Sequence, residues 1–207
     1  AFSRRLPLIP VNHLEGHVAA AYLADTALQP PFTALIASGG HTALYAVSED
    51  YSMRLLGQTL DDAAGEALDK AARMLGLGFP GGPALSKAAQ GGDPEVHDFP
   101  VALRERNNLD FSFSGLKTSL LYRIRDMDDT GLATALPDLA ASYEAAVVEA
   151  LRLKSLRAAE LQGAGSLVVA GGVAANSRLR SVLGRECEER GIGLVIPPPH
   201  LCTDNAA

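Results

Sequence analysis

Two groups of strand-like segments, separated by a long helical stretch, constrain most strongly what this chain of 207 residues can fold into. The first group has three apolar runs in close succession, at residues 32–37, 42–48 and 51–58. Gly39 and Gly40 form a tight-turn signal between the first two runs, which predicts a hairpin. The second group is a strand, a helix and a strand, at residues 166–170, 176–190 and 194–196. This alternation predicts a mixed sheet covered by helices, in an α/β layered fold.

Helical periodicity and capping residues predict the remaining elements. Helices are expected at residues 13–25, 62–75, 84–89, 116–125 and 139–161, and a further helix is expected to open at residues 202–207. A short strand at residues 8–11 would lead into the first helix. The order is then βββα, a helical insertion, βαβ and the start of another helix. By topology alone it resembles the repeated unit of the actin, hexokinase and heat-shock-chaperone (ASKHA) superfamily of two-lobed nucleotide-binding proteins.

The organisation of the chain suggests part of a larger two-lobed protein. Pro30-Pro31 is the predicted domain boundary, with residues 1–30 as a remnant of the first lobe and residues 31–207 as the second lobe. The second lobe would contain the helical insertion, over about residues 79–163. The sequence lacks an initiator Met and stops one turn into its last predicted helix. We therefore expect a fragment that is truncated at both ends.

The composition excludes several classes of protein. Apolar residues make up 47% of the sequence and the net charge is −6, which is typical of a folded globular protein. No apolar run is long enough to span a membrane, and the first residues do not resemble a signal peptide. The two cysteines, Cys187 and Cys202, are too few for a disulfide scaffold and favour a reducing, cytoplasmic compartment. The acidic balance argues against nucleic-acid binding by this chain alone.

His13 and His17 are the first candidate ligands. They lie four residues apart in a predicted helix, so their imidazoles project from one face and can bind one metal ion. Two partly exposed surface histidines are the alternative, and the spacing does not decide between them. Glu15 lies on the opposite side of the helix, unlike the glutamate of HExxH peptidases, which directly follows the first histidine.

Two glycine-rich turns are candidate anion sites. Residues 38–42 (SGGHT) form a polar turn at the hairpin, where glycines let backbone N–H groups approach an anion. Residues 168–176 pass from a strand through Gly171 and Gly172 to the start of a helix. That context brings a phosphate or a ribose to a helix N-terminus. The run does not match GxGxxG, which disfavours a Rossmann fold.

Acidic residues gather at the start of the helix predicted at residues 62–75. Acidic side chains in a first helical turn interact favourably with the helix dipole, and Glu66 is spaced to pair with Lys70. Asp69 shares a face with Asp62 and Glu66. Like charges placed in this way cost stability unless something binds there.

Further polar residues have two interpretations each. Ser114 is a candidate N-cap for the helix predicted at residues 116–125, and Lys117 behind it could face an anion. Asp204 is either an N-cap or, with the two histidines, the third ligand of an Fe(II) or Zn(II) ion. Cys202 is predicted to be a buried structural thiol and not a ligand.

Six motifs that occur in order along the chain carry a family resemblance. They lie at residues 12–17 (NHLEGH), 37–42 (ASGGHT), 61–70 (DDAAGEALDK), 113–118 (FSGLKT), 170–176 (AGGVAAN) and 202–205 (CTDN). Together they resemble the bacterial tRNA N6-adenosine threonylcarbamoyltransferase family, TsaD, over essentially the whole chain. Full members of that family extend further at both ends.

The resemblance implies roles for particular residues. His13, His17 and Asp204 match the family's metal ligands, which bind one Fe(II) ion, with Zn(II) as the alternative. His41 would be catalytic, by polarising the transferred group or moving a proton. The matched substrate-binding positions are Ile36, Ala37, Ser38, Gly39, Gly40, Asp69, Gly82 and Asn176.

The resemblance also implies a reaction and partners. The threonylcarbamoyl group of threonylcarbamoyl-AMP would be transferred to N6 of the adenosine 3′ of the anticodon, in tRNAs that read codons beginning with A. Proteins of the TsaB and TsaE types and tRNA would be its partners, with no membrane involved. Because part of the interlobe cleft would be absent, we expect impaired turnover by this chain alone.

Two other functions remain as hypotheses. One is a metal-dependent peptidase, suggested by the histidine pair. The other is a non-catalytic nucleotide-binding scaffold lobe, which would form a helix-packed dimer through Val18, Tyr22 and Leu23. Residues 101–125 carry five basic and two acidic side chains, so they could form either a patch for tRNA phosphates or an ordinary solvated surface.

Overall fold

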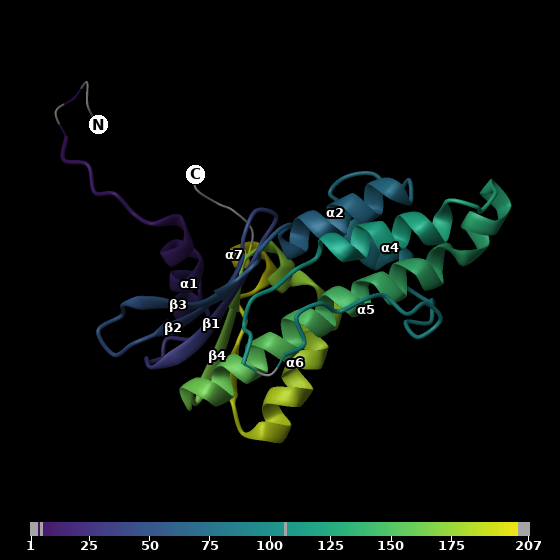
Figure 1. The fold of residues 1–207 in the computed structure, drawn as a ribbon. Coiled ribbons are helices and arrows are strands. Elements are labelled where there is room, and N and C mark those ends of the chain that lie inside the picture. Colours follow the sequence, from purple (N-terminus) through teal and green to yellow (C-terminus); the bar gives the residue numbers. More distant parts are fainter. Residues whose placement is uncertain (1–3, 5, 106, 203–207) are drawn as a thin grey trace.

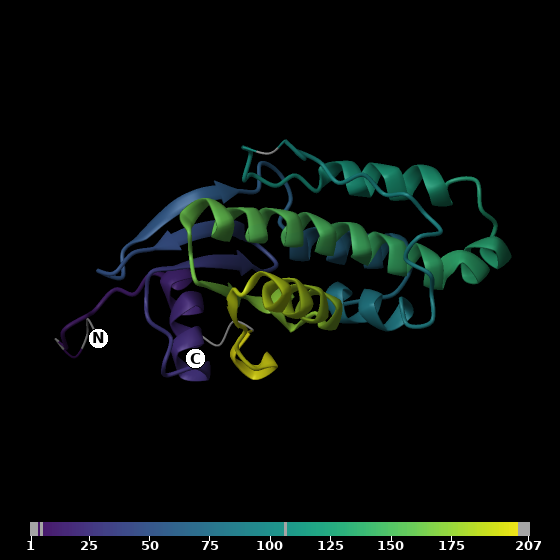
Figure 2. The ribbon, with the colours of Figure 1, turned by 90° about the horizontal axis from the view of Figure 1, so that it is seen from below.

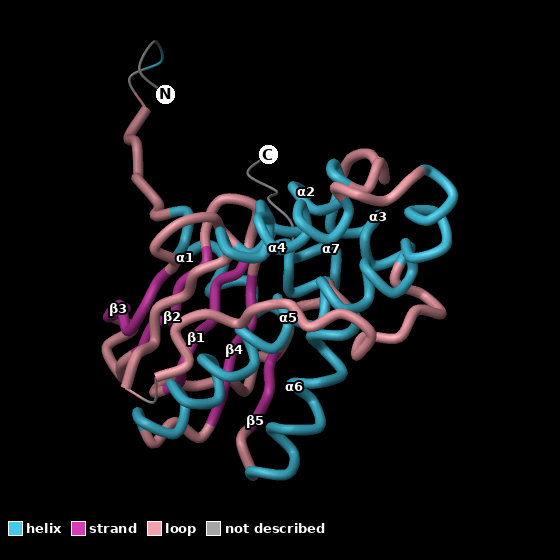
Figure 3. The backbone as a smooth tube through the Cα atoms, turned by 45° about the vertical axis from the view of Figure 1, so that its right-hand side comes forward, coloured by secondary structure: helices cyan, strands magenta, loops and turns pink. Residues whose placement is uncertain are grey.

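A mixed five-stranded sheet is the centre of the molecule. The structure, a computed structural model, describes residue 4, residues 6–105 and residues 107–202. The strands are β1 (Phe32–Ala37), β2 (Thr42–Val47), β3 (Met53–Gln58), β4 (Ser166–Ala170) and β5 (Gly193–Val195), and they lie in the order β3-β2-β1-β4-β5, as Figure 3 shows. β1 pairs antiparallel with β2 and parallel with β4, which confirms the hairpin and the mixed sheet.

Alternation along the central strands gives the sheet two buried faces. Ala34 and Ile36 of β1 pack with Val168 of β4 against α1 (His13–Ala24). Leu35 and Val169, which are paired in register, belong to the other core, beneath α5 (Asp129–Gln162) and α6 (Ser177–Arg190). α1 and α5 accordingly lie on opposite faces (Figures 1 and 2). β1 and β4 are therefore buried on both faces, as is usual for parallel strands.

A helical layer extends beyond one end of the sheet, as Figure 1 shows. It consists of α2 (Ala64–Met74), α3 (Gly81–Ala88), α4 (Ser114–Ile124) and the first half of α5. Phe111, Phe113 and Tyr143 are buried in its core. A 3-10 turn, η2 (Gly172–Ala175), leads from β4 into α6, and α7 (Pro199–Cys202) packs against both η2 and α1.

Three helices begin earlier than the sequence predicts, and the smallest difference is in α4, which begins at Ser114 and not at residue 116. α3 begins at Gly81 and not at residue 84, because the Asp69 carboxylate accepts hydrogen bonds from the first N–H groups of the helix. α5 begins at Asp129 and not at residue 139, and Asp128 caps its first turn. It continues through Pro137, which breaks many helices, because Leu132 and Leu136 on the preceding turns pack against the core.

The strand predicted at residues 8–11 is wrong. These residues have no regular structure, and Leu8, Ile9 and Val11 are exposed. A strand needs a neighbour with which to pair, and among the described residues none pairs with this segment. The helix predicted at residues 202–207 lies outside the described residues except for Cys202, which belongs to α7, so it stays a prediction.

The helices over residues 6–105 and 107–202 include none long and apolar enough to cross a membrane. The division of the chain at Pro30-Pro31 and the helical insertion stay predictions.

Candidate metal and nucleotide site

The carboxyl ends of β1 and β4 lie side by side and carry the two glycine-rich turns. Gly171 follows β4 with a φ of 90°. A Cβ atom at Gly171 would lie 2.4 Å from the Ala37 carbonyl oxygen at the end of β1. Only glycine tolerates both the positive φ and this close approach. The sequence therefore brings the two turns together at one edge of the sheet.

The turn at residues 38–41 is held by its own hydrogen bonds. The Ser38 N–H donates to the His41 carbonyl over 2.8 Å, and the His41 N–H donates to Ser38 Oγ over 3.1 Å. The start of α2 is fixed against this turn, because the Gly65 N–H donates to the Ser38 carbonyl over 3.1 Å. Gly39 and Gly40 are exposed, and within the described chain their N–H groups have no acceptor. These two amides are available to an anion.

The side chains of Ile36 and Ala37 do not point into this opening. Both are fully buried in the cores on the two faces of the sheet, and Ser38 is 8% exposed. Of the predicted substrate-binding turn, only Gly39 and Gly40 are exposed.

Three histidines gather beside this turn. The ring centroids of His13 and His17 are 4.6 Å apart, on one face of α1, and those of His13 and His41 are 6.5 Å apart. His17 is buried, whereas His13 and His41 are exposed. Asn12 caps the helix by accepting the Leu14 N–H over 2.9 Å, which fixes the turn that carries His13.

The two histidines of α1 fit two ligand positions of an iron or zinc site. Imidazoles four residues apart on one helix face suit either ion. Within the described ranges, no group of three His, Cys, Asp or Glu side chains forms a metal site. Asp204, the predicted third ligand, lies outside the described residues; α7, whose last described residue is Cys202, packs against α1.

A second group of predicted residues lies around α3. Asp69 Oδ1 accepts hydrogen bonds from the N–H groups of Gly81, over 2.9 Å, and Gly82, over 3.3 Å. Asp69 and Gly82, which are distant in sequence from the turns, are thereby brought together. Nothing in the described part of the chain links Asp69 or Gly82 directly to the histidines by a hydrogen bond.

Asn176 caps α6 and belongs to a cluster that sequence reasoning missed. Its Oδ1 accepts the Leu179 N–H over 2.9 Å, and its Nδ2 donates to Glu144 Oε1 over 2.6 Å and to Ser86 Oγ over 3.1 Å. Ser86 Oγ also donates to Glu144 Oε1. The sequence held one signal for Glu144: it is an acid between Tyr143 and Val147, on the face that the helix pattern predicts to be buried.

The acidic residues at the start of α2 are satisfied within the chain, so their like charges are offset without a bound ligand. Asp62 and Glu66 pair with Lys70 over 2.6 and 2.9 Å. Asp61 caps α4 by accepting from the Phe113 N–H over 2.7 Å and from the Ser114 N–H and hydroxyl. This corrects the prediction that Ser114 is the cap.

The Asp61 carboxyl shows the effect of these bonds. Partial burial raises its pKa, but hydrogen bonds from Ser112, Phe113 and Ser114 together outweigh burial and hold the pKa below its usual range.

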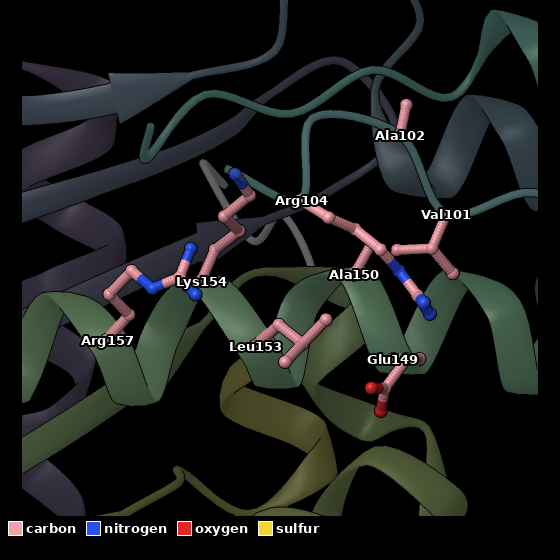
Figure 4. Close-up of a pocket in the computed structure, with 8 residues that line it drawn as sticks. All are labelled: Val101, Ala102, Arg104, Glu149, Ala150, Leu153, Lys154 and Arg157. Carbon is pink, nitrogen blue, oxygen red and sulfur yellow. The ribbon is translucent and has the colours of Figure 1, made fainter. Parts of the chain in front are cut away.

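The start of the predicted basic stretch at residues 101–125 lines a small cavity of about 200 Å³, shown in Figure 4. Val101, Ala102 and Arg104 face Glu149, Ala150, Leu153, Lys154 and Arg157 of α5 across it. Two of the cations already bind the protein. Lys154 Nζ donates to the carbonyls of Leu103 and Asn108, and Arg157 donates to the Glu105 carbonyl. Burial, assisted by Arg157, lowers the pKa of Lys154.

The remaining basic residues, on α4 and directly after it, differ in their contacts. Arg123 donates to the Asp98 carbonyl and lies over the Phe99 ring, and Arg125 pairs with Asp126 over 3.0 Å. Lys117 and Thr118 are exposed. 

Cys202 is a buried structural thiol, as predicted. It is fully buried, and its Sγ contacts the Pro197 carbonyl at 3.2 Å. Burial raises its pKa, with Arg180 opposing this, so the thiol is held protonated and is unsuited to act as a nucleophile.

Comparison with known structures identifies the fold. The chain is similar to full-length HypF in a phosphate- and nucleotide-bound form, with a TM-score of 0.70, 13% identity and coverage of 98% of this chain and 42% of that one. It is also similar to the activator of 2-hydroxyisocaproyl-CoA dehydratase from Clostridium difficile, with a TM-score of 0.56, 17% identity and coverage of 92% and 62%. The ASKHA fold predicted from the element order is confirmed.

Comparison of sequences is more specific. The family model for TsaD, tRNA N6-adenosine threonylcarbamoyltransferase, matches residues 1–207. Curated relatives with that name include proteins of Syntrophus aciditrophicus, 50% identical over 100% of this chain and 61% of the relative, and of Thermotoga neapolitana, 48% identical over 100% and 62%. The chain thus spans about 60% of the length of these relatives. It belongs to the tRNA N6-adenosine threonylcarbamoyltransferase (TsaD) family.

Proposed function

We propose that this chain forms part of an acyltransferase that modifies tRNA. The enzyme transfers the threonylcarbamoyl group of threonylcarbamoyl-AMP to N6 of the adenosine 3′ of the anticodon, in tRNAs that read codons beginning with A. The observation that carries the proposal is the meeting of three histidines with a turn whose glycine amides have no acceptor within the described chain, at the carboxyl edge of an ASKHA sheet. Ligands of open α/β sheets bind at this edge.

The proposed reaction requires each part of this arrangement. The N6 amine attacks the carbamoyl carbon, the amine loses a proton, and AMP leaves with the electron pair of the broken C–O bond. The amides of Gly39 and Gly40 bind the anionic adenylate, and the turn at Gly171 brings the start of α6 to the same edge. His41, exposed beside His13, receives the proton from the amine.

His13 and His17, with Asp204, would hold one Fe(II) ion, or Zn(II). A metal ion bound there supplies Lewis-acid stabilisation of the charge that develops on the carbamoyl oxygen. The buried position of His17 and its spacing from His13 support this ligand role.

The partners and the compartment are part of the same proposal. We infer partners of the TsaB and TsaE types, because the net charge of −6 gives the chain little overall attraction for tRNA phosphates. The two cysteines are free and buried, which is consistent with the cytoplasm.

A coupled assay tests the proposal. The whole enzyme of which this chain is proposed to form part is incubated with TsaB-type and TsaE-type partners, threonylcarbamoyl-AMP and tRNA, and both modified adenosine and released AMP are measured. We expect the two products in equal amounts. Casein cleavage that disappears in His13→Ala, without tRNA modification, would instead establish a peptidase. Adenylate binding with neither reaction would support the scaffold role.

A further inference from the structure

A buried carboxylate lies beside the proposed adenylate site, and none of the six matched motifs contains it. Glu144, on α5, is 6% exposed. Its Oε1 accepts hydrogen bonds from Asn176 Nδ2, over 2.6 Å, and from Ser86 Oγ. Ser86 lies on α3, one helical turn after Gly82, and Asn176 is the cap of α6. Glu144 therefore lies where three helices meet, in direct contact with one residue implied to bind nucleotide and one turn from another.

The partners of Glu144 are neutral. Within the described residues it forms no ion pair with a Lys, Arg or His side chain, and its Oε2 has no hydrogen-bond partner. A buried carboxylate without a cation is costly, so stability alone does not explain the residue. An amide in its place would keep both bonds to Oε1 and remove the charge. An acceptor of this kind is expected where a ligand donates hydrogen bonds.

The side-chain amide of Asn176 is already engaged in hydrogen bonds within the protein. Its Oδ1 is occupied by the Leu179 N–H, and its two Nδ2 hydrogens are used by Glu144 and Ser86. Asn176 thus fixes the cluster. Ser86 and Asn176 are half-buried, and Gly172 and Ala175 beside the cap are exposed. Glu144 Oε2 is not one of the fully buried unpartnered atoms of the described residues, so a ligand can reach it, and it has the most unused acceptor capacity of the cluster.

We propose that Glu144 is a specificity-determining residue, whose Oε2 accepts hydrogen bonds from the vicinal hydroxyls of the ribose of the bound adenylate. This inference rests on the proposed function, since that function supplies a ribonucleotide at this edge. A carboxylate is the usual acceptor for ribose hydroxyls in α/β nucleotide sites, and a charged acceptor strengthens such bonds. The enzyme then distinguishes ribonucleotides from deoxyribonucleotides through Glu144.

Calorimetric titration of this chain with AMP and with 2′,3′-dideoxy-AMP tests the inference. We expect the wild-type chain to bind AMP roughly tenfold more tightly or better, because bonds between hydroxyls and a charged group are lost in the dideoxy form. In Glu144→Gln the preference should fall to about twofold or less, since the uncharged amide retains the ties to Ser86 and Asn176. An unchanged preference in Glu144→Gln, or equal or absent binding of both nucleotides to the wild-type chain, overturns the inference.

Two further variants serve as controls for this experiment. Glu149→Gln lies on the same helix, pairs with Arg152 over 2.7 Å and does not touch the cluster, so it should keep the full preference. If Glu144→Gln does not fold, Glu144→Asp withdraws the carboxylate by one methylene and should reduce the preference. The coupled tRNA assay separates the two proposals: a ribose preference that depends on Glu144, without tRNA modification, leaves this inference standing and removes the proposed transfer.

Discussion

The carboxyl edge of the sheet and the cavity beneath residues 101–104 are both polar and partly open, yet they differ in how their polar groups are used. At the cavity, two of the three cations that line it, Lys154 and Arg157, are bound to backbone carbonyls of the loop that covers α5. At the sheet edge, the amides of Gly39 and Gly40 and Glu144 Oε2 have no partner within the described residues. Polar groups that lack a hydrogen-bond partner, and not charge or the presence of a cavity, therefore indicate which region binds a ligand.

The largest effect is expected at the histidines of the sheet edge. His13→Ala and His17→Ala should each lower tRNA modification by at least about a hundredfold, because each removes a metal ligand and the charge stabilisation that depends on it. His97→Ala, a half-buried histidine near α4, is the matched control and should retain modification. Full activity of the His13→Ala protein would remove the basis of the metal site.

The second effect tests the cavity side of the comparison. Lys154→Met should lower the free energy of unfolding by about 2–3 kcal/mol, because two partly buried carbonyls lose their charged donor. The affinity for AMP should stay unchanged at temperatures where the protein is folded. Urea unfolding measures the first quantity and calorimetry the second. Arg104→Met, on the exposed wall of the cavity, should change stability by less than about 0.5 kcal/mol. A large loss of AMP affinity in Lys154→Met would mean that the cavity binds the nucleotide.

A third variant disturbs the edge without touching the cavity. Gly171→Ala places a Cβ atom 2.4 Å from the Ala37 carbonyl oxygen at a φ of 90°, so it should cost about 2 kcal/mol of stability and separate the two turns. AMP affinity should fall with it. Gly172→Ala is the control, since a Cβ atom there meets nothing within 4 Å. Equal effects of the two variants would argue against close packing of the turns.

The smallest effect is expected at Asp61, whose two carboxylate oxygens both accept hydrogen bonds within the protein. Asp61→Asn should destabilise the protein by about 1 kcal/mol through the weakened α4 cap. Because the folded pKa of Asp61 lies below its unfolded value, its contribution is present above about pH 4 and is lost as pH falls through the folded pKa. The acid limb of a plot of stability against pH should therefore be shallower in Asp61→Asn. An identical limb in both proteins would contradict this.

The fold was accessible from the sequence where local signals agree with packing. Gly39-Gly40 predicts the hairpin because a tight turn is a local property, and the alternation in β1 matches its two buried faces. The starts of α3 and α5 were missed because they depend on Asp69, which is remote in sequence from Gly81, and on core contacts that offset Pro137. Residues 8–11 have strand-like composition, but pairing decides whether a strand forms.

Only part of the site could be predicted from the sequence. Regular helix geometry explains why the His13 and His17 spacing predicts adjacent imidazoles, and the structure has them together. Glu144 was missed because its significance comes from Ser86 and Asn176, which meet it only in the folded chain. The pair of Glu66 with Lys70 follows from its spacing within one helix and is confirmed, whereas the pairing of Asp62 with Lys70 and of Asp61 with the amides of α4 depends on how the chain folds around that helix.

Mapping of backbone amides during titration with AMP tests the central claim most directly. Two-dimensional NMR spectra of the chain should show the largest shift changes at Gly39, Gly40 and Gly82 and through residues 171–176, with little change at Arg104, Lys154 and Arg157. The opposite pattern, with changes concentrated around the cavity and none at the two glycine-rich turns, would contradict the assignment of the nucleotide site to the carboxyl edge of the sheet.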